Sequence, residues 1–130
     1  METHCEATFQ VTNWDESPVD EQPGTAKVTR AAVTKTYDGD ITGSSVTEWL
    51  MAYADSGDAT FVGLERLVGT VSGRTGSLVL EHVGTFADGA ARALLSVVPG
   101  SGTGDLASAS GNGDFLADPS GSVTLDLVLD

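Results

Sequence analysis

Two pairs of adjacent polar residues interrupt apolar segments in the middle of the chain, and their side chains are the ones best suited to chemistry. Glu65-Arg66 follows Phe-Val-Gly-Leu, and Glu81-His82 follows Leu-Val-Leu. Neighbouring residues on a strand point to opposite faces, so each pair places one member on each face. A carboxylate and an imidazole that meet on a buried face can act as a general acid and base, or hold a ligand carbonyl or hydroxyl. Glu65 and His82 are therefore the candidate catalytic residues; the alternative is a structural ion pair that fixes strand register.

The register between the two segments decides which residues share a face. The turn at 72–76 joins the segments, so their residues pair antiparallel. If paired residue numbers sum to an odd number, Glu65 shares a face with His82. If the sum is even, Glu65 shares a face with Glu81 instead, and like charges on one face of a strand pair are destabilising. The charges therefore favour the odd register. The candidate ligand-binding residues around this pair are Trp49, Tyr53, Leu67 and Leu80.

The segments that flank these pairs have the period-2 alternation of strands with one buried face. Cys5, Ala7, Phe9 and Val11 alternate with polar residues over residues 3–14, and the chain then enters a polar loop from residue 15 to residue 24 with two prolines. Cys5 is expected to be a buried core residue. Residues 25–37 carry three basic side chains and suit a sheet edge or a barrel rim.

Residues 41–54 are the one ambiguous segment. Val46, Trp49, Leu50 and Tyr53 fall at helical spacing. The segment begins with Ile-Thr-Gly-Ser-Ser, which is poor helix-forming sequence, and it lies between two turn signals. We therefore expect a strand.

The rest of the chain continues as short strands between turns. Strands are expected over residues 59–72, 77–87, 90–98, 114–117 and 122–130, with one helical turn over 105–110 and a tight turn at 118–121. Seven or eight strands without a long helix predict an all-β barrel or sandwich that occupies residues 1–130 as a single domain.

Charge and composition exclude several classes of partner. The chain has 19 acidic and 6 basic residues and a net charge of −13, which argues against nucleic-acid binding and against docking on an anionic membrane. The two histidines are far apart in sequence, so no metal site is expected. The single cysteine cannot form an intrachain disulfide, and no signal peptide or membrane span is recognisable, so we expect a cytoplasmic protein.

A glycine-rich segment follows Pro99 and is the most distinctive motif of the chain. Gly100-Ser-Gly102-Thr-Gly104 is not a P-loop, because no Gly-Lys-Ser/Thr follows, and it lacks the spacing of a dinucleotide-binding motif. No cofactor is therefore expected, and we interpret Gly100, Gly102 and Gly104 as a structural turn that needs glycine geometry.

The segment Gly100-Ser-Gly-Thr-Gly-Asp-Leu-Ala, together with His82-Val-Gly-Thr and Phe61-Val-Gly-Leu-Glu-Arg, resembles the bacterial domain-of-unknown-function 3224 family. The resemblance covers residues 3 to 129. It implies an allene-oxide-cyclase-like barrel of about eight antiparallel strands around a narrow lumen, an architecture that is similar to that of dirigent proteins. Relatives on this barrel bind hydrophobic small molecules and steer cyclisations by the shape of the lumen.

Two functions follow as hypotheses. In the first, the lumen binds a small hydrophobic ligand and supports cyclase- or isomerase-like activity. In the second, the protein is a non-enzymatic structural or binding module, a homo-oligomer whose barrel is filled by side chains. An open lumen with convergent polar groups favours the first, and a filled barrel favours the second.

Overall fold

The computed structural model describes residues 1–117 and 121–129. Within these residues the chain forms strands joined by turns, and no helix is present that is long and apolar enough to cross a membrane. The predicted turn at 118–121 lies mostly outside the described residues, and the helical turn predicted over 105–110 is a set of tight turns instead. The strands are β1 (Glu2–Pro18), β2 (Val28–Gly39), β3 (Ile41–Tyr53), β4 (Ala59–Val71), β5 (Arg74–Ala87), β6 (Ala90–Val97), β7 (Thr103–Gly104), β8 (Ser110–Ala117) and β9 (Gly121–Val128).

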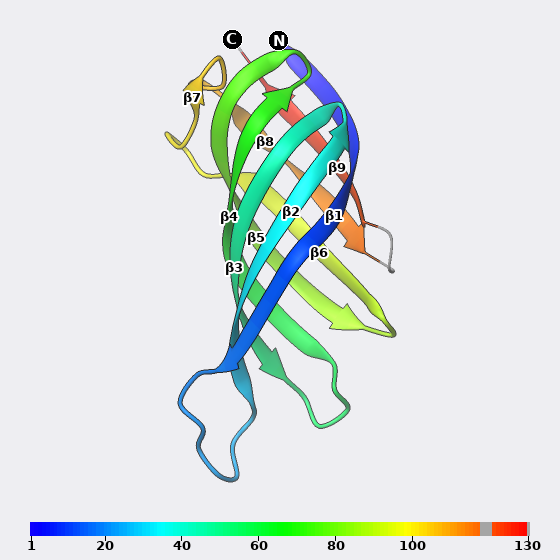
Figure 1. The fold of residues 1–130 in the computed structure, drawn as a ribbon, viewed down its shortest axis with the longest axis vertical. Helices are drawn as coiled ribbons and strands as arrows, with labels where there is room; N and C mark the ends of the chain where they lie inside the picture. The colour runs from blue at the N-terminus through cyan, green and yellow to red at the C-terminus, as the bar shows by residue number, and fades with distance from the viewer. Residues whose placement is uncertain (118–120, 130) are drawn as a thin grey trace.

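Eight of these strands form a closed antiparallel barrel (Figure 1). The strand order is β4-β3-β2-β1-β9-β8-β6-β5, and pairing of β4 with β5 closes the ring. The short strand β7 lies outside the ring and pairs with β5 alone. This arrangement confirms the all-β barrel that the sequence predicts.

Alternation along each strand fills the interior with apolar side chains. Cys5, Ala7 and Phe9 of β1 point inward and are buried, and so are Val123, Leu125 and Leu127 of the neighbouring strand β9. Residues 41–53 form a strand, as expected: Trp49 and Met51 are buried, whereas Leu50 between them faces outward. The three-residue spacing of the apolar residues in this segment arises because both faces of β3 carry apolar side chains.

The strands differ in length, and this difference shapes the barrel. β1 to β5 have 12 to 17 residues each, whereas β6, β8 and β9 have 8 each. The long strands overhang at the end opposite the termini, which we call the lower end; the end with the termini and β7 is the upper end (Figure 1). Among the described residues, β1 pairs with β9 only as far as Phe9, but with β2 as far as Pro18.

A bulge in β1 sets which side chains enter the lower end. Val11 pairs with Lys35 and Asn13 pairs with Thr34, so Thr12 is an extra residue on β1. Because of this extra residue, both Val11 and Trp14 face the interior. The sequence predicts a loop from residue 15, and this prediction is wrong for residues 15–18. These polar residues still belong to β1, because they pair with β2.

The glycine-rich segment folds over the upper end. Leu106 in this segment is buried and belongs to the core, the Asp105 N–H donates to the Thr75 carbonyl, and the Thr75 N–H donates to the Asp105 carboxylate. A Cβ atom on Gly102 would lie 1.8 Å from the backbone oxygen of Leu106, so only glycine allows this approach. Gly104 has a φ of +58°, a left-handed conformation that favours glycine. The segment thus closes the upper end of the barrel.

Candidate functional site: a sealed polar cluster beneath an open barrel end

Glu65 and His82 meet inside the barrel. Glu65 pairs with Leu80 and His82 pairs with Gly63, which is the odd register. Both side chains point inward and are fully buried, and His82 Nε2 lies 2.8 Å from Glu65 Oε1. The structure therefore places the two candidate catalytic residues in direct contact.

The Glu65 carboxylate is held by groups from three other strands. The hydroxyls of Tyr37 and Ser45 each donate a hydrogen bond of 2.5 Å to Oε2, and Lys35 Nζ lies 3.6 Å from Oε1. Burial opposes ionisation of this carboxyl, but the Lys35 charge and the hydrogen bond from His82 outweigh burial and lower its pKa to about 2. Glu65 is thus a buried carboxylate whose acceptor oxygens already have partners.

His82 is neutral and has partners on both ring nitrogens. Trp49 Nε1 donates to Nδ1 at 3.1 Å, so the ring proton is on Nε2 and is donated to Glu65. Burial lowers the pKa of His82, and Glu65 opposes this shift only in part. The contact between His82 and Glu65 is therefore a hydrogen bond of a neutral imidazole, and through it Glu65 fixes the position of Trp49.

Lys35 is the member of this cluster that the sequence did not reveal. The side chain is 1% exposed, and its ammonium lies 4.6 Å from the ring centre of Phe9, 4.9 Å from that of Phe115 and 5.4 Å from that of Trp49. Burial lowers the pKa of Lys35, and Glu65 counteracts that effect. Aromatic faces attract a cation, so these rings replace part of the lost hydration.

The polar strand of residues 25–37 was expected at an edge or rim, yet β2 lies within the closed ring. Ala31, Val33 and Tyr37 are buried at positions that alternate with solvent-facing residues, and Lys35 falls in the same series. This alternation was the feature of the sequence that could have predicted inward positions for Lys35 and Tyr37. Ser45 joins the cluster because it pairs with Lys35. The residues next to Ser45 in the sequence do not predict that its side chain is buried.

Two buried polar atoms of the cluster lack a hydrogen-bond partner among residues 1–117 and 121–129. They are Lys35 Nζ and Thr47 Oγ1. Thr47 pairs with Val33 on one side and with Glu65 on the other, so both orphan atoms belong to the same part of the lumen. The cluster is otherwise self-contained, because its carboxylate and imidazole bond to each other and to neighbouring strands.

The four predicted ligand-binding residues separate into two groups. Leu67 and Leu80 are fully buried core residues with no surface to offer a ligand. Trp49 is buried and forms a floor: its ring contacts Phe61 at 4.8 Å and Trp14 at 5.4 Å between ring centres. Tyr53 is partly buried at the lower end, where it packs against the core.

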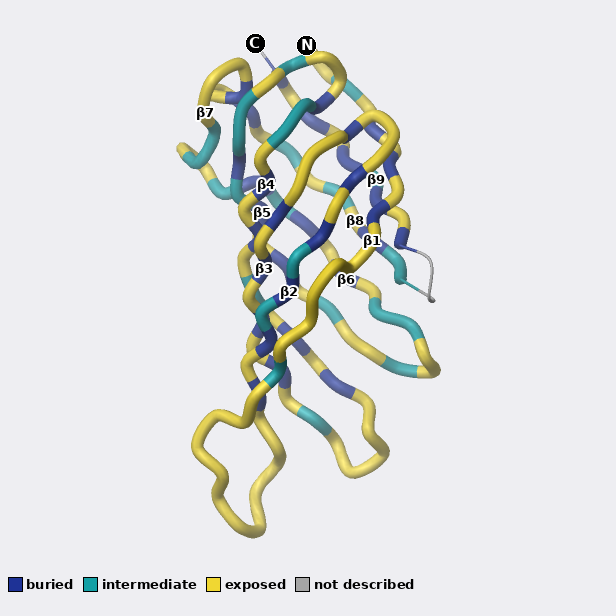
Figure 2. The backbone as a smooth tube through the Cα atoms, in the orientation of Figure 1, coloured by how far each residue is buried: buried dark blue, intermediate teal, exposed yellow. Residues whose placement is uncertain are grey.

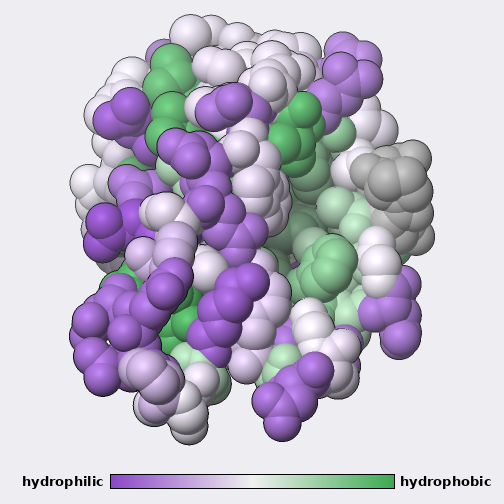
Figure 3. All heavy atoms as spheres, turned by 60° about the horizontal axis from the view of Figure 1, so that its bottom comes forward, coloured by the Kyte–Doolittle hydropathy of each residue, from purple (hydrophilic) through white to green (hydrophobic). Residues whose placement is uncertain are grey.

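The lower end exposes side chains that point into the barrel. Val11 is 46% exposed, Trp14 45% and Phe86 39%, although Val11 and Trp14 pair with the buried residues Lys35 and Val33. Figure 2 shows β1 as exposed along its lower half, and Figure 3, seen from this end, shows a recess lined by hydrophobic residues between hydrophilic ones. The sequence did not predict this opening, because it arises from the unequal lengths of the strands.

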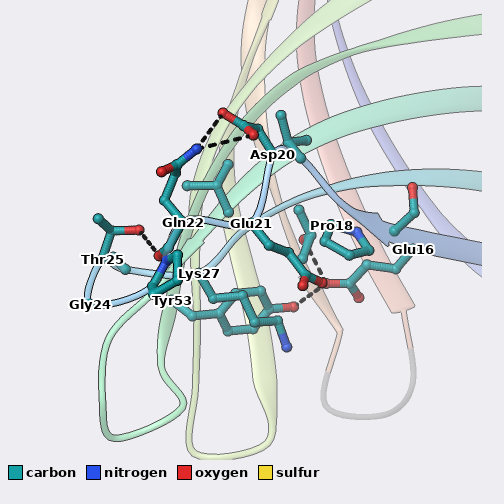
Figure 4. A pocket seen from close by; sticks show the side chains of 15 residues that line it. Glu16, Pro18, Asp20, Glu21, Gln22, Gly24, Thr25, Lys27 and Tyr53 are labelled. Carbon is teal, nitrogen blue, oxygen red and sulfur yellow. Dashed lines mark hydrogen bonds between the residues drawn. The ribbon is translucent and has the colours of Figure 1, made fainter.

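A second hollow lies beside this opening, inside the hairpin of β1 and β2 (Figure 4). Its volume is about 800 Å³, and residues 16–29 and Tyr53 line it. The Glu16 carboxylate accepts hydrogen bonds from Trp14 Nε1 at 3.0 Å, from the Thr29 hydroxyl at 2.6 Å and from the Tyr53 hydroxyl. Burial opposes ionisation of Glu16, but these hydrogen bonds outweigh it and lower the pKa. Glu16 thus ties Trp14, β2 and β3 together at the opening.

No group of three or more His, Cys, Asp or Glu side chains in residues 1–117 and 121–129 is arranged to hold a metal ion.

Comparison with known proteins gives a family and no activity. No curated protein matches the chain. A crystal structure of a protein with unknown function from the DUF3224 family of Shewanella oneidensis MR-1 is similar over 100% of this chain and 99% of that one, with 29% identity and a TM-score of 0.80. The model of the family described as "Protein of unknown function (DUF3224)" matches residues 5–129. Because that match spans nearly the whole barrel, the chain belongs to the DUF3224 family.

Proposed function

We propose that this protein binds a hydrophobic small molecule at the open lower end of its barrel. The observation that carries the proposal is the exposure of Val11, Trp14 and Phe86, which point inward and yet reach solvent. Apolar surface that is concave and aromatic is the usual lining of a small-molecule site. The exposed ring of Trp14 faces this recess rather than the outer wall.

The floor of this site is the layer of aromatic rings around Trp49. Trp14 meets Trp49 edge-on, and Trp49 packs against Phe61 and is anchored by its hydrogen bond to His82. A ligand at the opening therefore lies above Trp49, while Glu65 and Lys35 lie beneath it. In this proposal the polar cluster keeps the floor rigid, and the ligand contacts rings.

We assign no proton transfer to Glu65 or His82 in this function. Both ring nitrogens of His82 have partners, and the Glu65 carboxylate accepts hydrogen bonds from Tyr37, Ser45 and His82. An acid–base role, which stays a prediction, requires Trp49 to move aside first. A cyclase- or isomerase-like activity, in the manner of the allene-oxide-cyclase-like barrels, acts here by confining the substrate between the rings.

The test is binding of the neutral fluorophore N-phenyl-1-naphthylamine, whose emission rises in apolar surroundings. We expect saturable binding, and we expect Trp14→Ser and Val11→Ser to weaken it at least tenfold. Val128→Ser is the matched control, because Val128 is an exposed apolar residue on the outer face of β9. Equal loss in Val128→Ser would place the dye on the outer surface, and absence of saturable binding would favour the alternative of a filled, non-enzymatic barrel. Either result would overturn the proposal.

A further inference from the structure

The outer wall formed by β3, β4, β5 and β6 is apolar to a degree that the rest of the outer surface is not. Large apolar side chains that point away from the lumen are here between 46% and 70% exposed. In an antiparallel barrel the outward positions are normally polar, because they face water. The outward apolar residues on these strands are Val46, Leu50, Val62, Leu64, Val68, Val83 and Leu94.

Strand pairing makes these residues one continuous patch. Leu50 pairs with Val62, Val62 with Val83, and Val83 with Leu94, which is a row across all four strands. Leu64 lies two residues along β4 from this row, on the same face. Continuous apolar surface of this kind marks an interaction site more often than scattered single residues do.

The charges around the patch differ from those of the rest of the chain. Arg66 lies within it, Arg30 and Arg92 lie at its margins, and Glu48 and Glu81 are the acidic residues among them. The opposite wall of β1, β8 and β9 instead carries outward Glu6, Asp15, Asp114 and Asp126. In a chain with a net charge of −13, this face is where a second acidic copy can approach with the least repulsion.

The charged side chains of Arg66 and Glu81 are available to a partner molecule. Arg30 already lies 3.8 Å from Glu48. Arg66 pairs across the strands with Val79, and Glu81 with Leu64, so the two charges are diagonal neighbours on the same face. Neither has an ion-pair or hydrogen-bond partner in the described part of the chain.

We propose that this face is the contact between two copies of the chain, related by a twofold axis. In such a contact residue i meets residue j and residue j meets residue i. A twofold arrangement that places Arg66 of one copy against Glu81 of the other forms the same pair twice, with Leu64 and Val79 between the two pairs and the apolar row of each copy beside them. The contact lies on the outer wall and leaves the lower end open, so it is independent of the proposed ligand site.

The first experiment measures the molecular mass by sedimentation equilibrium over a range of protein concentrations. We expect a mass twice the 13.3 kDa of one chain at micromolar concentration. Val62→Glu places a charge in the middle of the apolar row and should give monomers, whereas Asp15→Arg, a charge change on the opposite wall, should leave the dimer intact. Circular dichroism melts establish that each variant is folded. A folded wild-type protein that stays monomeric at 100 micromolar and above would overturn the proposal.

A charge swap tests the twofold geometry itself. Arg66→Glu and Glu81→Arg should each weaken the dimer at least tenfold, since each single change sets like charges against each other twice. The double variant, Arg66→Glu with Glu81→Arg, restores both pairs and should recover the wild-type dissociation constant. If the double variant is as weak as the single ones, the two residues do not meet across a twofold axis. Binding of a different protein without self-association would equally contradict the proposal.

Discussion

The two ends of this barrel are built from the same strands but differ in how far their inward side chains are buried. At the upper end the glycine-rich segment packs against β5 and inserts its own Leu106 into the core. At the lower end the long strands overhang the short ones, and Val11, Trp14 and Phe86 stay exposed although they face inward. Alternation along a strand thus decides which way a side chain points, but the neighbouring strands decide whether it is covered.

The difference gives the upper end a role in stability and makes the lower end the place of the proposed binding site. Burial of Leu106 and close backbone packing at Gly102 are features that hold a fold together. Exposed aromatic rings around a recess contribute little to stability and are available to a ligand. Between the two ends, the buried cluster of Lys35, Glu65 and His82 separates the filled part of the lumen from the open part.

The largest effect is expected from the cluster that divides the ends. Lys35→Met leaves the Glu65 carboxylate buried without its counter-charge and should lower the free energy of unfolding by about 3–5 kcal/mol. Lys27→Met, at an exposed lysine whose ammonium lies 4.5 Å from the Tyr53 ring centre, is the matched control and should change stability by no more than about 1 kcal/mol. Urea denaturation measures both. Equal stability of the two variants would contradict a structural role for the buried charges.

A pair of apolar truncations compares the ends directly. Leu106→Ala at the closed end should cost about 3 kcal/mol, because it leaves a cavity in the core. Val11→Ala at the open end should cost less than about 1 kcal/mol, since that side chain is already half exposed. If the two variants lose similar free energy in urea denaturation, then the lower end is covered in solution and the comparison fails.

Substitutions at two glycines compare how tightly the backbone is packed at the two ends. Gly102→Ala should destabilise by about 2–3 kcal/mol, because the new Cβ meets the Leu106 carbonyl at 1.8 Å and that backbone cannot yield easily. Gly57 lies in a turn of the lower end with open space around it and a φ of +91°, so Gly57→Ala should cost only about 1 kcal/mol. A melting temperature of Gly102→Ala at or above that of Gly57→Ala would show that the upper end is loosely packed.

The last effect is confined to acid conditions. The pKa of Glu65 is lower in the folded chain, at about 2, than its usual value of 4.5, so the ionised group stabilises the fold above pH 4.5. That contribution, on the order of 3 kcal/mol, should be lost as pH falls from 4.5 to about 2. Glu65→Gln should remove this part of the pH dependence, whereas Glu16→Gln at the open end should leave most of it. An unchanged acid profile in Glu65→Gln would contradict the lowered pKa.

The sequence was sufficient for the barrel and for its buried pair. The alternation around Cys5 and Val123 identifies strands with one covered face, and the signs of four charges select the register that brings Glu65 to His82. Both inferences rest on short-range patterns. They hold because one slip in register would move every side chain to the wrong face.

The rest of the site depends on contacts that no local pattern contains. Lys35 does alternate with the buried Ala31 and Val33, but lysine is rarely buried, so this pattern is decisive only once β2 is known to have partners on both sides. The opening at Trp14 depends on where β9 ends relative to β1, and these strands are more than a hundred residues apart in the sequence. The bulge at Thr12 interrupts the alternation that begins at Cys5, so the sequence pattern does not predict that Trp14 points inward.

The one-sided pairing of the lower half of β1 also bears on how the protein avoids aggregation. Beyond Phe9 this strand presents a row of backbone N–H and C=O groups without a partner in the described chain, and such an edge can join the edge of another molecule. The segment carries the features that block such joining: a bulge at Thr12, carboxylates at Asp15 and Glu16, and Pro18, which has no N–H to donate. The barrel can therefore keep one end open at high protein concentration, because the strand that leaves it open is a poor template for fibril growth.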